Sequence, residues 1–217
     1  MEKLNVIDLG LCEYAPALEL QRELVARTQA GDDLRDHFVL VEHDPPTVTL
    51  GRRSEETDLL LTRQELARRG TELHAVTRGG QTTWHGPGQL TGYVITRLKK
   101  KGRTLRWLVE GIQRALSGLC GELGVRAAPL PGCTGLWVDT DPPAKIASIG
   151  VAVEKYVSYH GFALNVCNDL EPFGWIVPCG ARGAAVTSLA RQLRRPITVG
   201  QVKPLAVGRV AELLAAE

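Results

Sequence analysis

Residues 146–153 have the sequence IASIGVAV and are followed, after only Glu154 and Lys155, by residues 156–164, with the sequence YVSYHGFAL. Both segments are rich in β-branched, aromatic and small apolar residues and have the length of a strand, so both are predicted to be strands. No helix fits between them. A doubly wound parallel sheet, in which helices alternate with strands, is therefore not expected.

The rest of the chain gives further strand-like segments and a few helices. The other predicted strands are residues 38–41, 47–50, 72–76, 92–95 and 135–138. Helices are predicted at residues 16–30 and 104–123, in a short segment that begins at 62, and from 198 toward 214. Pro204 and Gly208 are expected to weaken the last of these helices. Runs of adjacent strands broken by few helices predict an α+β domain with mixed or antiparallel sheets and helices packed against them.

The bulk composition indicates a single globular domain over residues 1–217. Of the residues, 44% are hydrophobic and 23% are charged, which excludes the disordered and fibrous classes. No apolar run reaches the length of a membrane span, and the start Met1-Glu2-Lys3 lacks the basic-then-apolar order of a signal peptide. The sequence therefore predicts no membrane partner and a cytoplasmic location.

Charge and cysteine content narrow the choice of partners. A net charge of +2 and an aromatic content of 5% argue against nucleic-acid binding. The cysteines are odd in number, are widely spaced and form no C-x-x-C pair: Cys12, Cys120, Cys133, Cys167 and Cys179. They are predicted to be free thiols, with neither a disulfide framework nor a metal site. The dense basic run at 99–103 is either a solvated turn or a docking site for an acidic partner.

Residues 78–90, with the sequence RGGQTTWHGPGQL, form the most unusual stretch of the chain. Its four glycines and one proline leave little side chain to bury, so the backbone is either approached closely or adopts positive φ angles. Polar residues, among them Arg78, Gln81 and His85, alternate with the glycines. The pattern favours a loop that lines a pocket over an elaborate turn. It matches neither the phosphate loop G-x-x-x-x-G-K-[ST] nor G-x-G-x-x-G.

Three other segments carry candidate reactive residues, and each allows two interpretations. Lys145 leads directly into an apolar strand, so its amine lies near the buried sheet or reaches solvent at a strand edge. His160 and Asn165 flank another apolar strand, either as functional groups or as satisfied polar groups of the core. Cys179, in Ile176-Val177-Pro178-Cys179-Gly180, is either buried filler or a nucleophile presented on a turn.

Taken in this order, the segments closely resemble the lipoyl(octanoyl) transferase family. That family shares RGG-x-x-T-x-HGPGQL, K-[IVL]-[AC]-[AS]-[IL]-G, HG-[FL]-ALN, [IV]-PCG and VTSL. The corresponding residues here are 78–90, 145–150, 160–165, 177–180 and 186–189. The resemblance covers nearly the whole chain, and such a combination is far more specific than any single motif.

The resemblance implies the α+β fold of lipoate and biotin protein ligases. It also implies transfer of an octanoyl group from octanoyl-acyl carrier protein to a lysine of lipoyl domains, those of 2-oxoacid dehydrogenase complexes and of the glycine cleavage H protein. By position, Cys179 resembles the acyl-carrying nucleophile and Lys145 the residue that activates it, with His160 and Asn165 as candidates for supporting roles. The residues that resemble the walls of the acyl site are Arg78, Gly79, Gly80, Gln81, Thr82, Thr83, Trp84, His85, Ser148, Ile149, Gly150, Gly161, Phe162 and Ala163.

Transfer of an octanoyl group between a thioester and an amine suits a cysteine and a lysine at these positions. A thioester donor and an amide product make the transfer downhill, so neither ATP nor a metal cofactor is expected. A cysteine is a good intermediary because exchange of one thioester for another is nearly isoenergetic. A free thiol has a pKa of about 8.5 and is little ionised at neutral pH, so Lys145 is expected to help as a charge, as a base or as both. The oxyanion is expected to be met by backbone N–H groups around Cys179-Gly180, with help from His85 or His160.

Three rival functions stay open at this point. An ATP-dependent lipoate–protein ligase shares the fold and the acceptor but has no use for a nucleophilic cysteine. A cysteine hydrolase would use His160 as its base and release octanoate. A non-catalytic binding module would not need both Cys179 and Lys145. Candidate cations for docking an acidic carrier are Arg52, Arg53, Lys99, Lys100, Lys101, Arg182, Arg194 and Arg195.

Overall fold

The computed structural model describes residues 4–99, 103–177 and 185–216. Its helices are α1 (Tyr14–Ala30), α2 (Arg63–Arg68), α3 (Leu105–Glu122), α4 (Leu189–Leu193) and α5 (Val199–Ala215). Its strands are β1 (Asn5–Cys12), β2 (His37–His43), β3 (Thr47–Leu50), β4 (Glu72–Ala75), β5 (Thr82–His85), β6 (Gln89–Ile95), β7 (Ala127–Leu130), β8 (Cys133–Val138), β9 (Ala144–Glu154), β10 (Val157–Asn165) and β11 (Ala185–Val186). In these ranges no helix is long and apolar enough to cross a membrane.

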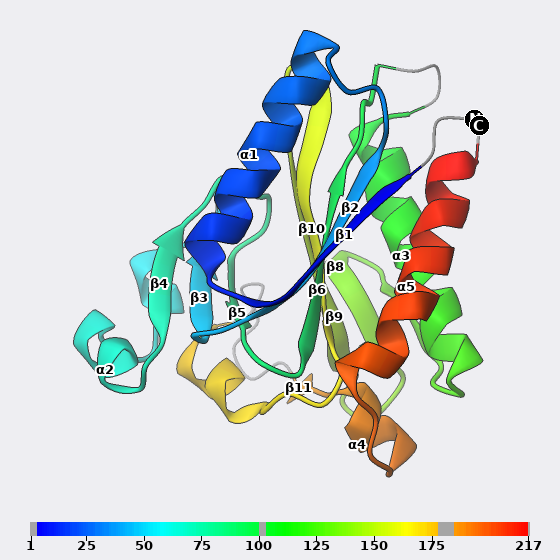
Figure 1. Ribbon diagram of the computed structural model, residues 1–217. Coiled ribbons are helices and arrows are strands. Elements are labelled where there is room, and N and C mark those ends of the chain that lie inside the picture. The colour runs from blue at the N-terminus through cyan, green and yellow to red at the C-terminus, as the bar shows by residue number, and fades with distance from the viewer. Residues whose placement is uncertain (1–3, 100–102, 178–184, 217) are drawn as a thin grey trace.

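Two sheets and the helices form layers (Figure 1). The main sheet has the order β1-β2-β6-β10-β9-β8-β7, and β11 adds to β9. Its β1–β2 and β11–β9 pairs are parallel and its other pairs antiparallel. The small sheet has the order β4-β3-β5. Helices α3 and α5 cover one face of the main sheet, while α1 and the small sheet lie on the other face. The predicted α+β class with mixed sheets is therefore confirmed.

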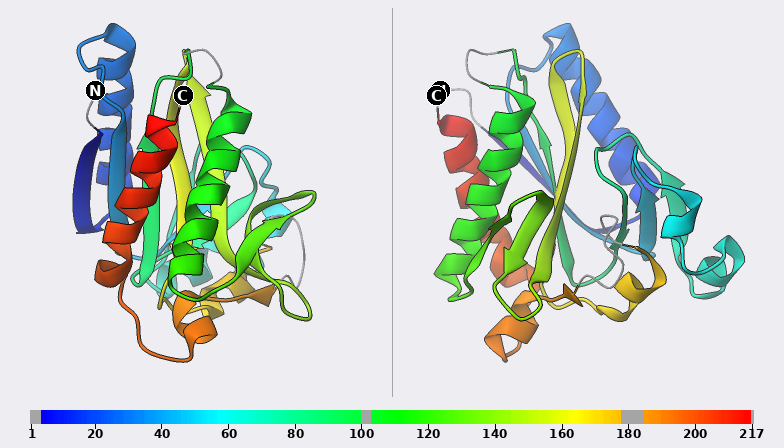
Figure 2. Two further views of the ribbon diagram at one scale, coloured as in Figure 1. Left: turned by 90° about the vertical axis from the view of Figure 1, so that its right-hand side faces the viewer. Right: turned by 180° about the vertical axis from the view of Figure 1, so that it is seen from behind.

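The core between the main sheet and the α3–α5 pair follows from a clean apolar stripe. Leu108, Ile112, Leu116 and Leu119 fall on one face of α3 and are almost completely buried. The helix begins where predicted, because the Thr104 hydroxyl accepts the Trp107 N–H at 3.0 Å. Figure 2 shows α3 and α5 side by side over the sheet.

Helix α5 is present as predicted, and it continues without a break through Pro204 and Gly208, the two residues expected to weaken it. Buried residues before and after the proline hold the helix against the core, among them Val202, Ala206 and Val210. Tertiary packing of an apolar face outweighs the loss of one backbone hydrogen bond.

The sequence did not reveal four of the strands, β1, β5, β7 and β11, nor the short helix α4. The case that matters most is β5, which lies inside the glycine-rich stretch predicted to be a loop. Its residues Thr82–His85 include two β-branched and two aromatic or imidazole side chains, and they pair with β3. The glycines on both sides concealed this strand signal. The stretch is therefore a loop, a strand and a turn rather than one loop.

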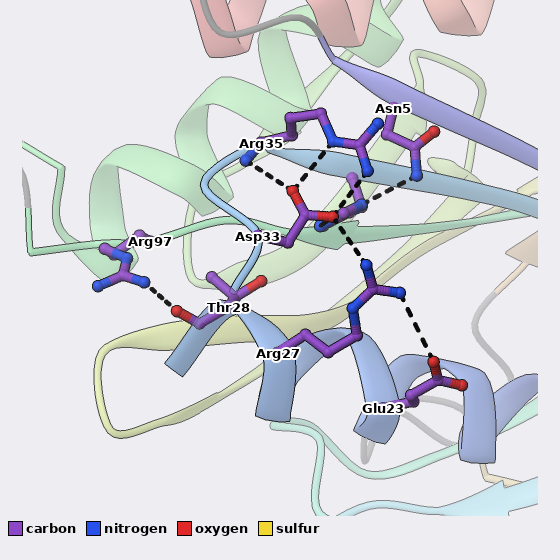
Figure 3. Close-up of polar contacts among 8 residues, drawn as sticks. Asn5, Glu23, Arg27, Thr28, Asp33, Arg35 and Arg97 are labelled. Carbon is purple, nitrogen blue, oxygen red and sulfur yellow. Dashed lines mark hydrogen bonds and ion pairs between the residues drawn. The ribbon is translucent and has the colours of Figure 1, made fainter. Parts of the chain in front are cut away.

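Helix α1 is tied to the main sheet at its C-terminal end by a polar cluster (Figure 3). The Asp33 carboxylate accepts the Nε–H and Nη2–H groups of Arg35 at 3.0 and 2.8 Å and lies 3.6 Å from Arg27 of α1. Arg97, which follows β6, donates to the backbone carbonyl of Thr28. These contacts fix the helix along the sheet and so fix the position of Tyr14 at its other end.

Substitution by alanine is expected to have opposite effects on the free energy of unfolding at Gly92 and at Gly121. A Cβ atom on Gly92 of β6 would lie 2.5 Å from Cζ of Phe162 and 2.8 Å from Cε2 of Phe38, both buried. Gly92→Ala is therefore expected to lower the free energy of unfolding by about 1–3 kcal/mol. Gly121→Ala, on an open face of α3 with nothing within 4 Å, should raise it by up to about 1 kcal/mol. Urea unfolding of both variants checks this, and a Gly92→Ala protein as stable as the wild type would contradict the tight packing.

Candidate functional site

A cavity of about 180 Å³ lies on the α1 side of the main sheet, where the small sheet and its loops face strands β6, β10 and β9. The floor of the cavity consists of two rows of residues set by strand register. Thr91, Ala163 and Ser148 are opposite one another in β6, β10 and β9, and the next row is Tyr93, Gly161 and Gly150. Directly opposed residues point to the same face of a sheet. Because β10 and β9 contribute only small residues to these rows, space is left above them.

The roof of the cavity is the glycine-rich segment before β5. Arg78 holds it in place, since its guanidinium donates to the backbone and side-chain oxygens of Thr49, each at 2.8 Å, and to the Gly79 carbonyl. A Cβ atom on Gly150 would lie 2.8 Å from the Gly79 carbonyl oxygen. The glycine in β9 therefore allows the roof to approach the floor. In β5, which follows the roof segment, the hydroxyl of Thr83 lies 3.3 Å from that of Ser148 in the floor.

One end of the cavity is open and the other is buried. At the open end, Gly132, Cys133 and Thr134 line it and are exposed. Across the floor, Ser148 is half-buried, whereas Thr91 is only 1% exposed. The cavity therefore deepens from β8 and β9 toward β6.

Aromatic and imidazole side chains surround the buried end, and burial keeps them neutral. Burial raises the pKa of Tyr14 to about 12 and lowers the pKa of His160 to about 3. It also moves the pKa of His85 well below its usual value. His160 adopts a left-handed conformation with φ of 59°, and its N–H donates to the Gln21 side chain of α1 at 2.9 Å.

Lys145 lies beside the open end of the cavity. It is 3% exposed, in β9, and its Nζ atom lies 5.4 Å from the centre of the Trp137 ring, which lines the cavity. The same amine comes within 3.4 Å of where a Cβ atom on Gly135 would be. Only a glycine at 135, with φ of 124°, leaves the lysine this position in the sheet. Cys179 lies outside the residues that the structure describes.

The residues just after the cysteine segment are fixed next to Lys145. Val186 of β11 pairs with Lys145 in a parallel register, and the Thr187 N–H donates to the Lys145 carbonyl at 2.9 Å. On the other side of the segment, the Val177 N–H donates to the Asp58 carbonyl at 2.8 Å.

A chain of buried hydrogen bonds connects the cavity to this region. His85 Nδ1 lies 2.9 Å from Oε1 of Gln89, and the Gln89 amide donates to Oδ1 of Asn165 at 2.9 Å. The Asn165 amide donates in turn to the Thr187 carbonyl at 3.0 Å. Asn165 therefore does not line the cavity. It links the His85 side of the cavity to the strand that flanks Lys145.

The structure brings together most of the predicted wall residues. All of them line the cavity except Gly79 and Trp84. Gly79 instead donates its N–H to the Val151 carbonyl, and Trp84 points away from the cavity into a small core with Val48, Leu66 and Phe173. The alternation of side chains along β5 explains the outward direction of Trp84.

Several lining residues had no sequence motif to reveal them, notably Tyr14, Arg53, Thr91, Tyr93 and Trp137. Thr91 and Tyr93 continue the pattern of every second residue that begins at Gln89, so alternation along β6 was a usable signal. Tyr14 and Gln21 lie on the buried stripe of α1, where a polar residue at a core position was a second signal.

Cys12, Cys120, Cys133 and Cys167 are free thiols, which confirms the prediction for these four. Among the described residues, no group of three or more His, Cys, Asp or Glu side chains is placed to hold a metal ion.

The fold resembles that of lipoate and biotin protein ligases. The bi-partite lipoate protein ligase of Thermoplasma acidophilum superposes with a TM-score of 0.75 at 14% identity and covers 100% of this chain and 86% of that one. The biotin protein ligase of Aquifex aeolicus superposes with a TM-score of 0.55 at 12% identity over 99% and 69% of the two chains. At such identities the likeness shows the fold alone.

Sequence comparison is more specific. The model of the lipoyl protein ligase A/B catalytic domain matches residues 13–210. The octanoyltransferase of Desulfotalea psychrophila is 40% identical over 208 residues, which are 96% of this chain and 92% of that protein. The chain therefore belongs to the octanoyltransferase family, whose members are acyltransferases of protein lipoylation, as the motifs predicted.

The neutral histidines around the cavity predict a loss of stability in mild acid. Burial lowers the pKa of His43 to about 4 and that of His160 to about 3. Below the unfolded-state pKa of about 6.5, the unfolded chain binds protons that the folded chain does not. Stability should therefore fall as the pH drops from about 6.5 toward 4, by about 1.4 kcal/mol per pH unit for each such histidine.

Urea unfolding at pH 7.5, 6.0 and 5.0 measures this slope. A His160→Asn variant should show a flatter pH dependence than the wild type, because it lacks one of these two imidazoles of lowered pKa. Equal unfolding free energies at pH 7.5 and 5.0 would show that these histidines are not buried in the neutral form.

Proposed function

We propose that this enzyme transfers an octanoyl group from octanoyl-acyl carrier protein to a lysine of lipoyl domains through a thioester on Cys179. The acceptors are the lipoyl domains of 2-oxoacid dehydrogenase complexes and the glycine cleavage H protein. The observation that carries the proposal is the position of Lys145, a buried amine beside Trp137, which lines a cavity with a floor of small residues. Membership of the octanoyltransferase family supports the acyl group and the reaction class.

In the first half-reaction, Lys145 accepts the thiol proton of Cys179, and the thiolate attacks the carbonyl carbon of the donor thioester. The bond from that carbon to the carrier sulfur breaks, and the carrier thiolate takes the proton back from Lys145. In the second half-reaction, the amine of the acceptor lysine attacks the Cys179 thioester. An amide forms, the cysteine sulfur leaves, and the amine proton passes to Lys145 and then to the sulfur.

This chemistry needs neither a nucleotide nor a metal, because the donor is already activated. A ligase uses its nucleotide to make an acyl adenylate from a free acid. A thioester has comparable reactivity toward an amine, so the activation step is not required. The fold alone does not separate the two classes, since lipoate protein ligases share it. The relationship to octanoyltransferases at 40% identity favours transfer.

His160 is poorly placed to act as the base of a competing hydrolase. It pairs with Val151 in β9, six residues along the strand from Lys145, a separation of about 20 Å at about 3.3 Å per residue. Its pKa of about 3 also makes it a weak base at neutral pH. We infer that His160 shapes the buried end of the cavity and that Lys145 moves the proton.

Of the candidate docking cations, Arg53 belongs to the cavity lining. Its backbone N–H donates to the Gly80 carbonyl and that of Arg52 to the Arg78 carbonyl, both at 3.1 Å. Lys99 instead follows β6 and lies over the Tyr156 ring at 5.8 Å. Lys100, Lys101 and Arg182 lie outside the described residues. We propose that an acidic carrier meets the enzyme at Arg52 and Arg53.

Intact-protein mass spectrometry tests the covalent intermediate. Mixed with octanoyl-acyl carrier protein, without ATP and without acceptor, the wild type should gain one octanoyl group. Hydroxylamine should remove it, and a lipoyl domain added later should receive it. Cys179→Ala should gain nothing, while the matched variants Cys12→Ala and Cys167→Ala, at free thiols outside the cavity lining, should behave like the wild type.

The other outcomes identify the rivals. An unmodified enzyme that needs octanoate with ATP would be a ligase, and one that releases octanoate without an acceptor would be a hydrolase. An unmodified enzyme that still octanoylates its acceptor would show direct transfer and would reject the cysteine intermediate.

Substitutions of Lys145 separate its charge from its proton transfer. Lys145→Ala should lower kcat/KM by a factor of at least about 100, in the range of general acid–base catalysis. Lys145→Arg should restore little, because arginine keeps the charge but does not release a proton at neutral pH. Single-turnover rates of enzyme acylation are the measurement. An arginine variant with full activity would show that Lys145 contributes charge alone.

A further inference from the structure

The buried end of the cavity contains one polar group with no assigned task. The hydroxyl of Thr91 in β6 is buried and has no hydrogen-bond partner in the part of the chain that the structure describes. Thr91 lines the cavity. Its neighbours there are satisfied: the Tyr93 hydroxyl lies 2.6 Å from Nε2 of His43, and the His85 ring contacts Thr49 and Gln89. A buried polar group without a protein partner calls for an explanation, such as an ordered water or a ligand.

Thr91 lies where an eight-carbon chain would end. From Ser148 in β9 to Thr91 in β6 is two strand spacings, or about 10 Å. An extended octanoyl chain has seven carbon–carbon bonds of about 1.5 Å, and its zigzag spans roughly 9 Å. A chain with its carbonyl above Ser148 of β9 therefore brings its terminal methyl group to Thr91. Two more methylenes would extend it by roughly 2.5 Å, past the hydroxyl.

An apolar cavity alone favours longer chains, because each buried methylene adds about 0.8 kcal/mol. An upper limit on chain length therefore needs an opposing effect at the buried end. A hydroxyl that hydrogen-bonds water there supplies one, since a longer chain must remove that water and leave the hydroxyl unsatisfied.

We propose that the Thr91 hydroxyl sets the upper chain-length limit of the acyl cavity by keeping its buried end hydrated. The inference rests on the proposed function and identifies its specificity-determining residue. It assigns to β6 a role separate from that of Lys145, because Thr91 acts at the far end of the chain and takes no part in proton transfer.

The test compares decanoyl with octanoyl transfer in Thr91→Val. Valine has the shape of threonine without the hydroxyl and suits a central strand. Because the lost hydroxyl has no partner in the described chain, the variant is expected to fold. The ratio of kcat/KM for decanoyl- over octanoyl-acyl carrier protein should rise about tenfold, the effect of one unsatisfied buried hydroxyl. Thr91→Ser, which keeps a hydroxyl, should retain a ratio close to that of the wild type.

The matched control is Thr71→Val. Thr71 is also buried with an unpartnered hydroxyl among the described residues, but it does not line the cavity, so its ratio should not change. An unchanged ratio in Thr91→Val would overturn the proposal and point to a steric limit from the surrounding rings. An equal rise in Thr71→Val would overturn it as well, because the effect would then be general loosening.

A second measurement separates this proposal from the proposed function. Calorimetric binding of free octanoate and decanoate needs no acyl transfer. The wild type should bind octanoate more tightly than decanoate, and Thr91→Val should reverse or remove that preference. If the wild type transfers no acyl group but shows this change in binding, the proposed reaction fails and the role of Thr91 stands. If transfer proceeds and the binding preference is the same in both proteins, Thr91 has no such role.

Discussion

The register of three strands is the constraint on which the rest of the structure depends. In β6, β10 and β9, one set of alternate positions carries Leu90, Phe162, Leu164 and Ile149, which pack toward α3 and α5. The other set carries Thr91, Ala163, Ser148 and two glycines, which leave the cavity open. If one strand shifted by one residue relative to its neighbours, its core-facing and cavity-facing side chains would exchange places. The same alternation therefore builds the core and preserves the binding space on the other side of the sheet.

Several polar groups around the cavity are buried. Residues from distant segments of the chain form hydrogen bonds with them. Gln21 of α1 satisfies the backbone of His160, Thr49 of β3 satisfies Arg78, and Asn165 of β10 joins Gln89 to Thr187. These bonds connect the surroundings of the cavity to α1, to the small sheet and to the segment after β11. A buried hydrogen-bond network makes the surrounding structure rigid when every group has a partner. It lowers stability when a group is left without one. The cavity walls are thus held by the same contacts that hold α1 and the small sheet in place.

Much of the fold was predictable from the sequence, because its signals are local. The stripe of α3, the N-cap at Thr104 and the two long strands 146–153 and 156–164 follow from periodicity, and all appear in the structure. The strand β5 was not predictable, since flanking glycines hid it. Helix α5 was predicted across Pro204, and tertiary packing holds it there.

The residues of the candidate site that belong to sequence motifs were predictable. The residues that reach the cavity only through strand pairing were not. The glycine-rich stretch and the segment around Ser148 carry recognisable patterns. Thr91, Tyr93 and Trp137 reach the cavity only because of the strands they pair with. Trp84 shows the converse, since it belongs to a motif yet packs into the small core. A motif records which segment matters, whereas the strand register determines which side chains of that segment face the cavity.

The placement of Lys145 on a central strand suits its proposed role as the base. Proton transfer requires the amine to be within hydrogen-bond reach of its partners in both half-reactions, and a strand paired on both sides holds such a position better than a loop does. Lys145 pairs with Trp137 on one side and with Val186 on the other. The second pairing is the informative one, because Val186 follows the segment that contains Cys179. The sheet therefore fixes, in one register, both the proposed base and the chain that returns from the proposed nucleophile.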